Sequence, residues 1–342
     1  MLHNLPDRIN TVEELDEVLS RPGEALTASL KRLNGDVMIL GAGGKIGPTM
    51  ARMAQRAIQQ ALTKRHVYAV DVFDLPELAR QGVTTIKCDM MDQKAVEALP
   101  RVENIIFMVG RKFGSTGAES MTWAINVIVP YHVARTFTAA RIVAFSTGCV
   151  YPVTHVFTGG STESTPPDPV GEYAMSCLGR ERMFDYFSDN HGERVVKWRL
   201  NYAVELRYGV LWDIATKVHT GQPVDVTTGF LNCMWQGDTA DYALRSLELA
   251  TSPATALNVT GPEILAVRDV AHRFGRLFGK EPVFTGQENG KAYLCNAIKA
   301  NALFGNPAVP VGKVIDWIAH WIQIKGQALG KPTHFETQDG KY

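Results

Sequence analysis

The chain has 342 residues, 45% of them hydrophobic and 20% charged, which is typical of a folded globular protein and excludes an intrinsically disordered one. Lys and Arg together number 35, as do Asp and Glu, so no overall charge attracts a nucleic acid or an anionic membrane. Any anionic ligand must be held by a local site. The length exceeds that at which a single core usually stops growing, so we expect one large domain with a smaller satellite.

The five cysteines are scattered along the chain without a C-x-x-C pair, which argues against a disulfide framework or structural zinc. The nine histidines lack ligand spacing, so we expect no metal site. The first 21 residues do not resemble a signal peptide, and no apolar run approaches the ~20 residues that span a bilayer. We therefore expect a soluble, cytoplasmic protein that acts on a small molecule and has no nucleic-acid or membrane partner.

The chain begins with a predicted helical extension over residues 1–35. Thr11-Val12-Glu13-Glu14 has the pattern of a capping box at a helix start, and a second helix is expected around 25–33. Asn34-Gly35 then predicts a turn into a buried strand at 36–40. A glycine-rich loop at 41–47 follows, and Pro48 stands in the first turn of the next helix, where its missing amide proton costs nothing.

From this point apolar strands and helical patterns alternate. The expected strands are 36–40, 66–71, 84–87, 104–109, 141–145 and 194–199, and the clearest helical patterns are 120–139 and 173–188. This order predicts an α/β fold, a doubly wound parallel sheet of the Rossmann type. We expect a NAD-binding domain at 36–203 and a smaller C-terminal substrate subdomain at 204–342, partly interleaved with it. The tail at 331–342 is expected to be an exposed extension.

The glycine loop lies where a dinucleotide site is expected, between the first strand and its helix. Gly41 permits a tight turn, Gly44 a close approach of the backbone to a pyrophosphate, and Gly47 close packing of the helix. Asp71 ends the second strand at about the expected ~20-residue distance. Its carboxylate can hold the adenosine ribose hydroxyls and repel a 2′-phosphate, so the pattern predicts NAD in preference to NADP.

Several segments resemble one enzyme family. The spacing of Gly41, Gly44 and Gly47 is similar to the G-x-x-G-x-x-G loop of the extended short-chain dehydrogenase/reductases, the NAD-dependent epimerase/dehydratase family. Further similar segments are Cys88-Asp89-Met90-Met91-Asp92, Phe145 to Tyr151, Asn126, Trp235 to Asp241, and Asn258 to Gly261. The resemblance covers about residues 36–325. It implies a cofactor site made of Gly41, Gly44, Lys45, Ile46, Gly47, Asp71, Asp89, Met90, Val109 and Tyr173.

The resemblance also implies a catalytic hydroxyl at Thr147 and a tyrosine acid/base at Tyr173. In the family a lysine four residues after the tyrosine stabilises the ionised phenol, whereas this chain has Cys177 there. The ordinary pKa of tyrosine is ~10, so we expect the pKa of Tyr173 to be higher than in relatives that keep the lysine. Arg180, two turns beyond Tyr173, or water is expected to fill the gap.

A second set of departures concerns the substrate. Asn232 stands where nucleotide-sugar enzymes of the family usually have a diphosphate-binding arginine, and Gly148 and Cys149 stand where sugar dehydratases have an Asp-Glu pair. These replacements favour a smaller hydroxylated substrate, for which we select Lys112, Thr147 and Asn201 as binding residues. We expect a surface salt bridge rather than ligand binding at Arg207, and core positions for Trp317 and Trp321.

Three functions remain open at this point. The first is a NAD-dependent oxidoreductase or epimerase acting on a sugar, polyol or sugar acid by hydride transfer. The second is a nucleotide-sugar epimerase with an unusual diphosphate site. The third is a NAD-binding regulator without catalysis, as the missing lysine would allow. By resemblance we also expect a homodimer formed through the helices near 120–139 and 173–188.

Overall fold

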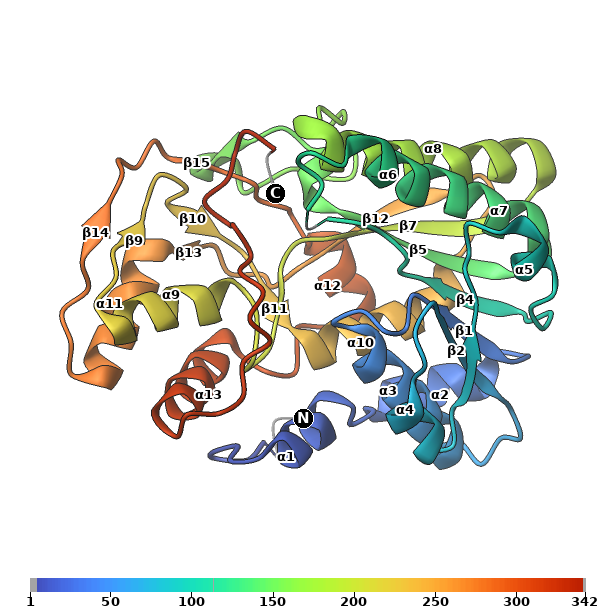
Figure 1. Cartoon of the computed structure of the whole chain (residues 1–342), viewed down its shortest axis with the longest axis horizontal. Coiled ribbons are helices and arrows are strands. Elements are labelled where there is room, and N and C mark those ends of the chain that lie inside the picture. Colours follow the sequence, from blue (N-terminus) through green and yellow to red (C-terminus); the bar gives the residue numbers. More distant parts are fainter. Residues whose placement is uncertain (1–4, 113, 341–342) are drawn as a thin grey trace.

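The computed structural model describes residues 5–112 and 114–340. Its centre is a seven-stranded sheet in the order β12-β7-β5-β4-β1-β2-β3, with every pair of neighbours parallel (Figure 1). The strands are β1 (Val37–Leu40), β2 (Val67–Asp71), β3 (Thr84–Lys87), β4 (Asn104–Phe107), β5 (Arg141–Thr147), β7 (Arg194–Leu200) and β12 (Thr255–Val259). The strands expected from the sequence are therefore confirmed, and β12 is added at the edge beside β7.

Helices cover both faces of this sheet. On one face α2 (Glu24–Arg32), α3 (Gly47–Gln60) and α10 (Gln236–Arg245) pack on one another and on a core that contains Ile39, Val143 and Trp198. On the other, α5 (Gln93–Glu97), α7 (Val129–Thr136) and α8 (Gly171–His191) cover Leu40, Phe107 and Ala144. Alternate residues of the strands thus supply two separate cores. The predicted fold class, a doubly wound α/β fold, is confirmed.

The remaining core lies in the C-terminal part. It is built by α9 (Val210–Thr220), α11 (Val267–Phe278) and α13 (Val311–Gln323), whose apolar faces meet around Trp317 and Trp321. Both tryptophans are buried, as the sequence predicted. Short paired strands connect these helices: β6 (Thr154–His155), β8 (Ala203–Val204), β9 (Val224–Asp225), β10 (Phe230–Leu231), β11 (Met234–Trp235), β13 (Leu265–Ala266), β14 (Phe284–Thr285) and β15 (Lys291–Ala292).

The smaller helical elements join these layers. They are α4 (Pro76–Arg80), α6 (Glu119–Trp123), η1 (Ala124–Ile128), η2 (Gly148–Val150), η3 (Val156–Thr158), η4 (Ser246–Leu249) and α12 (Ile298–Phe304). Within the described residues no helix is both long and apolar enough to cross a membrane.

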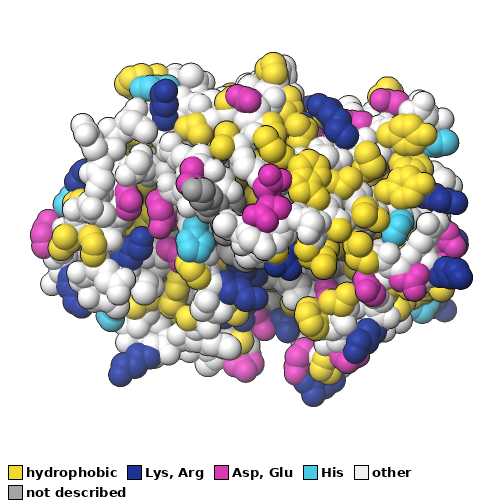
Figure 2. All heavy atoms as spheres, turned by 45° about the horizontal axis from the view of Figure 1, so that its top comes forward, with side chains coloured by type: hydrophobic (Ala, Val, Ile, Leu, Met, Phe, Trp, Pro, Cys, Tyr) yellow, Lys and Arg dark blue, Asp and Glu magenta, His cyan; other side chains and the backbone are white. Residues whose placement is uncertain are grey.

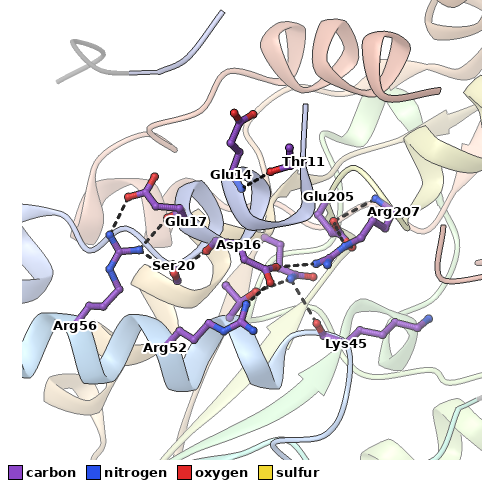
Figure 3. A network of polar contacts seen from close by, with 12 residues as sticks. Thr11, Glu14, Asp16, Glu17, Ser20, Lys45, Arg52, Arg56, Glu205 and Arg207 are labelled. Carbon is purple, nitrogen blue, oxygen red and sulfur yellow. Dashed lines mark hydrogen bonds and ion pairs between the residues drawn. The ribbon is translucent and has the colours of Figure 1, made fainter. Parts of the chain in front are cut away.

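The N-terminal extension is an integral layer of the fold. In α1 (Val12–Leu19) the Thr11 hydroxyl accepts a hydrogen bond from the Glu14 amide, as the capping pattern predicted. Asp16 on α1 binds Arg52 on α3 at 2.5 Å and Arg207, which precedes α9, at 3.3 Å (Figure 3). Arg207 also pairs with Glu205, so this arginine forms a salt bridge as expected, but in a half-buried place rather than on the surface. One carboxylate of α1 therefore links the helix after the glycine loop to the C-terminal part.

Two local expectations are corrected. The helix expected over 120–139 is interrupted by the π-helical turn η1 and ends at Thr136, because Pro130 has no amide proton to bond the carbonyl of Asn126.

The tail from Lys331 is packed against the protein rather than being an exposed extension. Thr333 and Phe335 are buried, and the Leu329 amide donates to the Arg207 carbonyl at 3.0 Å. Hydrogen bonds to distant segments and one buried aromatic side chain hold this tail, and a sequence pattern shows neither.

Candidate active site

The sheet places its ligand crevice between β1 and β4. Strand order reverses there, since β1 leads outward to β2 and β3 while β4 leads outward to β5 and β7. Loops that leave the carboxyl ends of two such strands diverge and open a crevice, where ligands of doubly wound folds bind. The loop after β1 is the glycine loop, and the loop after β4 contains Gly110 and Lys112. A ligand site is therefore expected between these loops.

Close packing dictates two of the three spaced glycines. Gly41 has φ +85°, and a Cβ atom there would lie 2.9 Å from the amide nitrogen of Val109. A Cβ at Gly47 would lie 2.2 Å from the Ala42 carbonyl oxygen. Gly44 differs, because its nearest contact would be an ordinary 3.4 Å from the Gly41 oxygen and the residue borders the cavity. The loop is thus closely packed at Gly41 and Gly47, whereas its backbone at Gly44 is accessible. This arrangement fits a pyrophosphate bound by the loop backbone.

Asp71 supports the loop from behind. Its carboxylate is buried at the end of β2 and accepts a 2.8 Å hydrogen bond from the Gly43 amide. Asp89 and Met90 follow β3; Asp89 is exposed and accepts a hydrogen bond from the Met91 amide, whereas Met90 is buried. These three residues and Val109 lie outside the lining of the cavity described next. They remain our proposed contacts for the adenosine half of the cofactor.

The largest set of predicted residues meets in one cavity of about 440 Å³. Nine of the assigned residues line it: Gly41, Gly44, Lys45, Ile46, Gly47, Lys112, Thr147, Tyr173 and Asn201. Residues that the sequence did not single out as ligand-binding also line it, among them Tyr202, Tyr208, Gln236, Lys331 and Thr333. Gln236 lies in a segment whose resemblance was noticed, but no local pattern could bring the tail residues here.

Thr147 and Tyr173 reach this cavity from neighbouring elements. Thr147 ends β5, and its hydroxyl accepts a hydrogen bond from the Cys149 amide at 3.1 Å, which fixes the side chain at the turn into η2. Tyr173 lies in the first turn of α8, whose central part packs on β5. A hydroxyl and a phenol therefore border the same space as the glycine loop, although 25 residues separate them and the loop is more than 100 residues away.

The surroundings of Tyr173 disfavour its ionised form. Burial is the largest cause that raises the pKa of Tyr173 well above 10, followed by the nearby thiols of Cys177 and Cys149, and a hydrogen bond with Cys177 adds to it. The charge of Arg180 acts in the opposite direction. The expectation that this pKa exceeds that of relatives with the lysine stays a prediction.

Arg180 lies beneath the site rather than inside it. Its guanidinium donates to the Phe145 carbonyl and to the Asn126 side chain, each at 2.8 Å. A Cβ at Gly110 would lie 2.3 Å from the Arg180 guanidinium, so the loop after β4 needs glycine where it passes over this arginine. The predicted reach of Arg180 toward Tyr173 is therefore electrostatic: the arginine favours the ionised phenol, while its guanidinium donates hydrogen bonds to β5 and η1.

Lysines gather on the other side of the cavity. The Lys45 ammonium lies 3.3 Å from the centre of the Tyr208 ring, and that of Lys112 lies 5.6 Å from the centre of the Tyr173 ring. Burial, then the charges of Lys112 and Lys331, lower the pKa of Lys45 to about 7, while Asp213 raises it. Burial also lowers the pKa of Lys112. The cavity is therefore electropositive.

Asn201 and Asn232 form a closed polar contact next to the cavity. The Asn201 amide nitrogen donates to the Asn232 oxygen at 2.7 Å and to the Tyr293 carbonyl at 3.1 Å. The Asn232 nitrogen donates to the Cys295 carbonyl at 2.6 Å, and Asn232 is buried. A Cβ at Gly148 would lie 2.7 Å from the Cys295 sulfur, so this segment also presses on the turn after β5. Asn232 thus serves internal packing.

Comparisons with known proteins agree with this geometry. Residues 37–228 match the NAD dependent epimerase/dehydratase family. An L-arabinose 1-dehydrogenase (NAD(P)(+)) of Haloferax volcanii is 23% identical over 180 residues, 48% of this chain and 66% of the relative, so the match spans just under two thirds of that relative.

Solved structures show the same fold. MoeE5 in complex with UDP-glucose and NAD superposes with a TM-score of 0.70 at 18% identity, covering 85% of this chain and 99% of that chain. UDP-glucose 4-epimerase of Thermotoga maritima with UDP-glucose gives 0.69 at 16% identity and the same coverage. The family match spans more than half of the chain and includes the glycine loop, every strand of the sheet except β12, and most residues that line the cavity. The chain belongs to the NAD-dependent epimerase/dehydratase family.

Proposed function

We propose that this enzyme oxidises or epimerises a hydroxyl-bearing carbon of a small sugar, polyol or sugar acid, with Tyr173 as acid/base and Thr147 as the group that orients the substrate. The observation that supports this most is that Thr147, Tyr173 and the glycine loop border one cavity. A proton acceptor must lie within hydrogen-bond reach of the alcohol it serves, and the cofactor must face the same carbon. Groups that border one cavity can meet both requirements.

The residues around the cavity fit a dinucleotide. Amides of the loop around Gly44 would hold the pyrophosphate, and the Asp71 carboxylate the adenosine ribose, with Asp89, Met90 and Val109 beside the adenine half. Bound NAD supplies a hydride acceptor or donor. The chain's own contribution is to fix the alcohol on the Thr147 hydroxyl and to take its proton at the Tyr173 oxygen.

Because Cys177 replaces the family lysine, another positive charge must stabilise the Tyr173 phenolate. Arg180 favours the Tyr173 phenolate from beneath, and the Lys112 ammonium lies above the same ring. Both cations come from positions that the usual pattern does not use. We propose that they stabilise the ionised phenol during proton transfer.

We further propose that the substrate has no nucleotide. A diphosphate is commonly held by the charged, forked guanidinium of arginine, whereas Asn232 is neutral, buried and bonded to Asn201 and Cys295. The solved relatives that contain UDP-sugars keep the nucleotide-sugar epimerase as the second candidate. Calorimetry with UDP, dTDP and their sugars separates the two: we expect weak binding, and a micromolar Kd would make the second candidate the leading one.

The test of the activity is a screen of NAD reduction across neutral sugars, polyols and sugar acids with the wild-type enzyme. We expect turnover of at least one of these classes, with loss of that turnover in Tyr173→Phe. Binding of NAD without turnover of any sugar or nucleotide sugar would instead support a NAD-binding regulator, the role that the cysteine at position 177 would permit.

We propose a homodimer that forms through α6, α7 and α8. Figure 2 shows hydrophobic side chains gathered on the half of the molecule that these helices cover. The exposed ones include Met121 (50%), Ile128 (41%), Met175 (44%) and Tyr186 (53%). Contiguous apolar patches on soluble proteins mark interaction sites, and a two-fold interface uses the same patch twice. Light scattering should give a dimer for the wild type and a monomer for Met175→Glu with Ile128→Glu; a monomeric wild type would contradict this.

We also propose a division of the chain into two domains and a cytoplasmic location. Most of residues 204–342 would shape the substrate side, while β12 and α10 return to the sheet of the NAD-binding part. All five cysteines are free and buried, which supports a reducing cytoplasm.

A further inference from the structure

The cavity is lined by cations from three distant parts of the chain. Lys45 belongs to the glycine loop, Lys112 follows β4, and Lys331 belongs to the C-terminal tail. The nearest pair in sequence is separated by 67 positions, since 112 − 45 = 67. No helix face or strand face explains this grouping, so it is a product of the tertiary fold.

Each of these lysines is held in place. The Lys45 carbonyl accepts a hydrogen bond from Gln236, while its side chain extends away from the ion pairs of α1 (Figure 3) and lies on the Tyr208 ring. Lys331 lies between two anchors of the tail: the Leu329 amide on the Arg207 carbonyl, and Thr333, whose amide donates to Asp213 at 2.8 Å. The backbone at Lys45 and the tail on either side of Lys331 are therefore anchored next to the cavity that both residues line.

The charge balance here differs from that of the neighbouring network on α1. There Arg52 and Arg207 are paired with Asp16 at 2.5 and 3.3 Å, so their charges are compensated by acids of the same chain. In the cavity Lys45 lies close enough to Lys112 and Lys331 for their charges to oppose its own, and the Asp213 carboxylate offsets a smaller part of this effect. Like charges in a half-buried space cost free energy, and an anion placed between them would relieve both repulsion and desolvation.

Building on the proposed function, we propose that the substrate is an anionic sugar, a sugar acid or a sugar phosphate, whose charged group is bound by Lys45, Lys112 and Lys331. Thr147 lines the same space, and its hydroxyl suits a hydroxyl of a sugar. The pyrophosphate of the cofactor does not require these lysines, because the loop amides serve it. Lys112 also lies beside Tyr173, at the reacting end of the cavity.

The test measures anion binding in a variant that should not turn over substrate. Its outcome is therefore independent of the activity screen. Tyr173→Phe protein saturated with NADH, in which the pyrophosphate site is filled, is titrated with inorganic phosphate and with acetate by calorimetry. We expect saturable binding of at least one anion, weakened about tenfold in Lys112→Met and in Lys331→Met, as loss of a charged hydrogen bond predicts. Lys31→Met, an exposed lysine on α2, is the matched control and should bind as the parent does.

The two probes separate the two sources of charge. Stronger binding of phosphate indicates a sugar phosphate, and stronger binding of acetate a sugar acid. Absence of saturable binding for both, or equal binding by the parent and the lysine variants, would overturn the proposal. Loss of NADH affinity in Lys112→Met and Lys331→Met, with anion binding intact, would also overturn it by assigning the lysines to the cofactor. Anion binding in an enzyme that turns over no sugar would instead contradict the proposed function alone.

Discussion

The two sides of the cavity are built in different ways. The cofactor side consists of consecutive residues, Gly41 to Gly47, supported by Asp71 at the end of the next strand. The substrate side draws on Lys112, Thr147, Tyr173, Asn201, Lys331 and Thr333, which come from five separate segments. A phosphate-binding loop needs only local backbone geometry, whereas a substrate pocket can be assembled from any segments that the fold brings together. Chemistry on the substrate side can therefore change while the loop stays recognisable.

The largest expected effect concerns the substrate side. Tyr173→Phe should lower kcat by at least about a hundredfold, because the phenol is the proposed proton acceptor, while the Kd for NAD stays within about twofold of the wild type. Tyr186→Phe changes an exposed tyrosine of the same helix and should leave both unchanged. Turnover that survives Tyr173→Phe would show that this residue is not the proton acceptor. It would also contradict the assignment of the chemistry to the substrate side of the cavity.

Substitutions in the glycine loop, unlike Tyr173→Phe, should weaken the binding of NAD. Gly47→Ala places a Cβ 2.2 Å from the Ala42 oxygen, so we expect both a lower melting temperature and a loss of NAD affinity of about 2 kcal/mol, roughly 30-fold. In Gly44→Ala the new Cβ meets only an ordinary contact at 3.4 Å, so stability should hold while NAD affinity falls. Thermal unfolding and NAD titration of the two variants check this, and equal stability loss would contradict the geometry.

Asp71 tests the choice of cofactor. In Asp71→Asn a side-chain oxygen still accepts from the Gly43 amide, but the negative charge that repels a 2′-phosphate is gone. We expect wild-type preference for NAD over NADP and a gap about tenfold smaller in the variant, chiefly through tighter NADP binding. Equal or tighter binding of NADP by the wild type, measured by titration of both cofactors, would refute the assignment of Asp71.

The smallest effect is expected at Cys177. Only ionised Tyr173 accepts a proton, and its pKa is raised by burial, Cys177 and Cys149 and lowered by Arg180, so the rate should keep rising into alkaline pH. Cys177→Ala removes a hydrogen bond and a thiol that raise this pKa. The rise should then begin at lower pH, with the maximal kcat changed less than about threefold.

The matched control is Cys233→Ala, a buried cysteine outside the cavity lining, whose pH profile should follow the wild type. A Cys177→Ala enzyme as inactive as Tyr173→Phe, with NAD still bound, would show that the thiol takes part in the chemistry.

Sequence alone was sufficient for the elements whose cause is local. Alternation of apolar strands and helices predicted the doubly wound sheet, and the capping pattern at Thr11 predicted the start of α1. Glycine spacing and the acid at position 71 indicated the dinucleotide loop, because a tight turn and a ribose contact need particular residue types at fixed distances. The replacement at Cys177 was visible for the same reason.

Tertiary structure decided what depends on contacts between distant segments. The buried place of Asn232 and the path of the tail over the cavity follow from packing against residues that lie far away in the chain. A tail has no periodic pattern when it is held by single hydrogen bonds and one buried side chain such as Phe335. For that reason Lys331 could not be connected to Lys45 and Lys112 until the fold placed all three around one space.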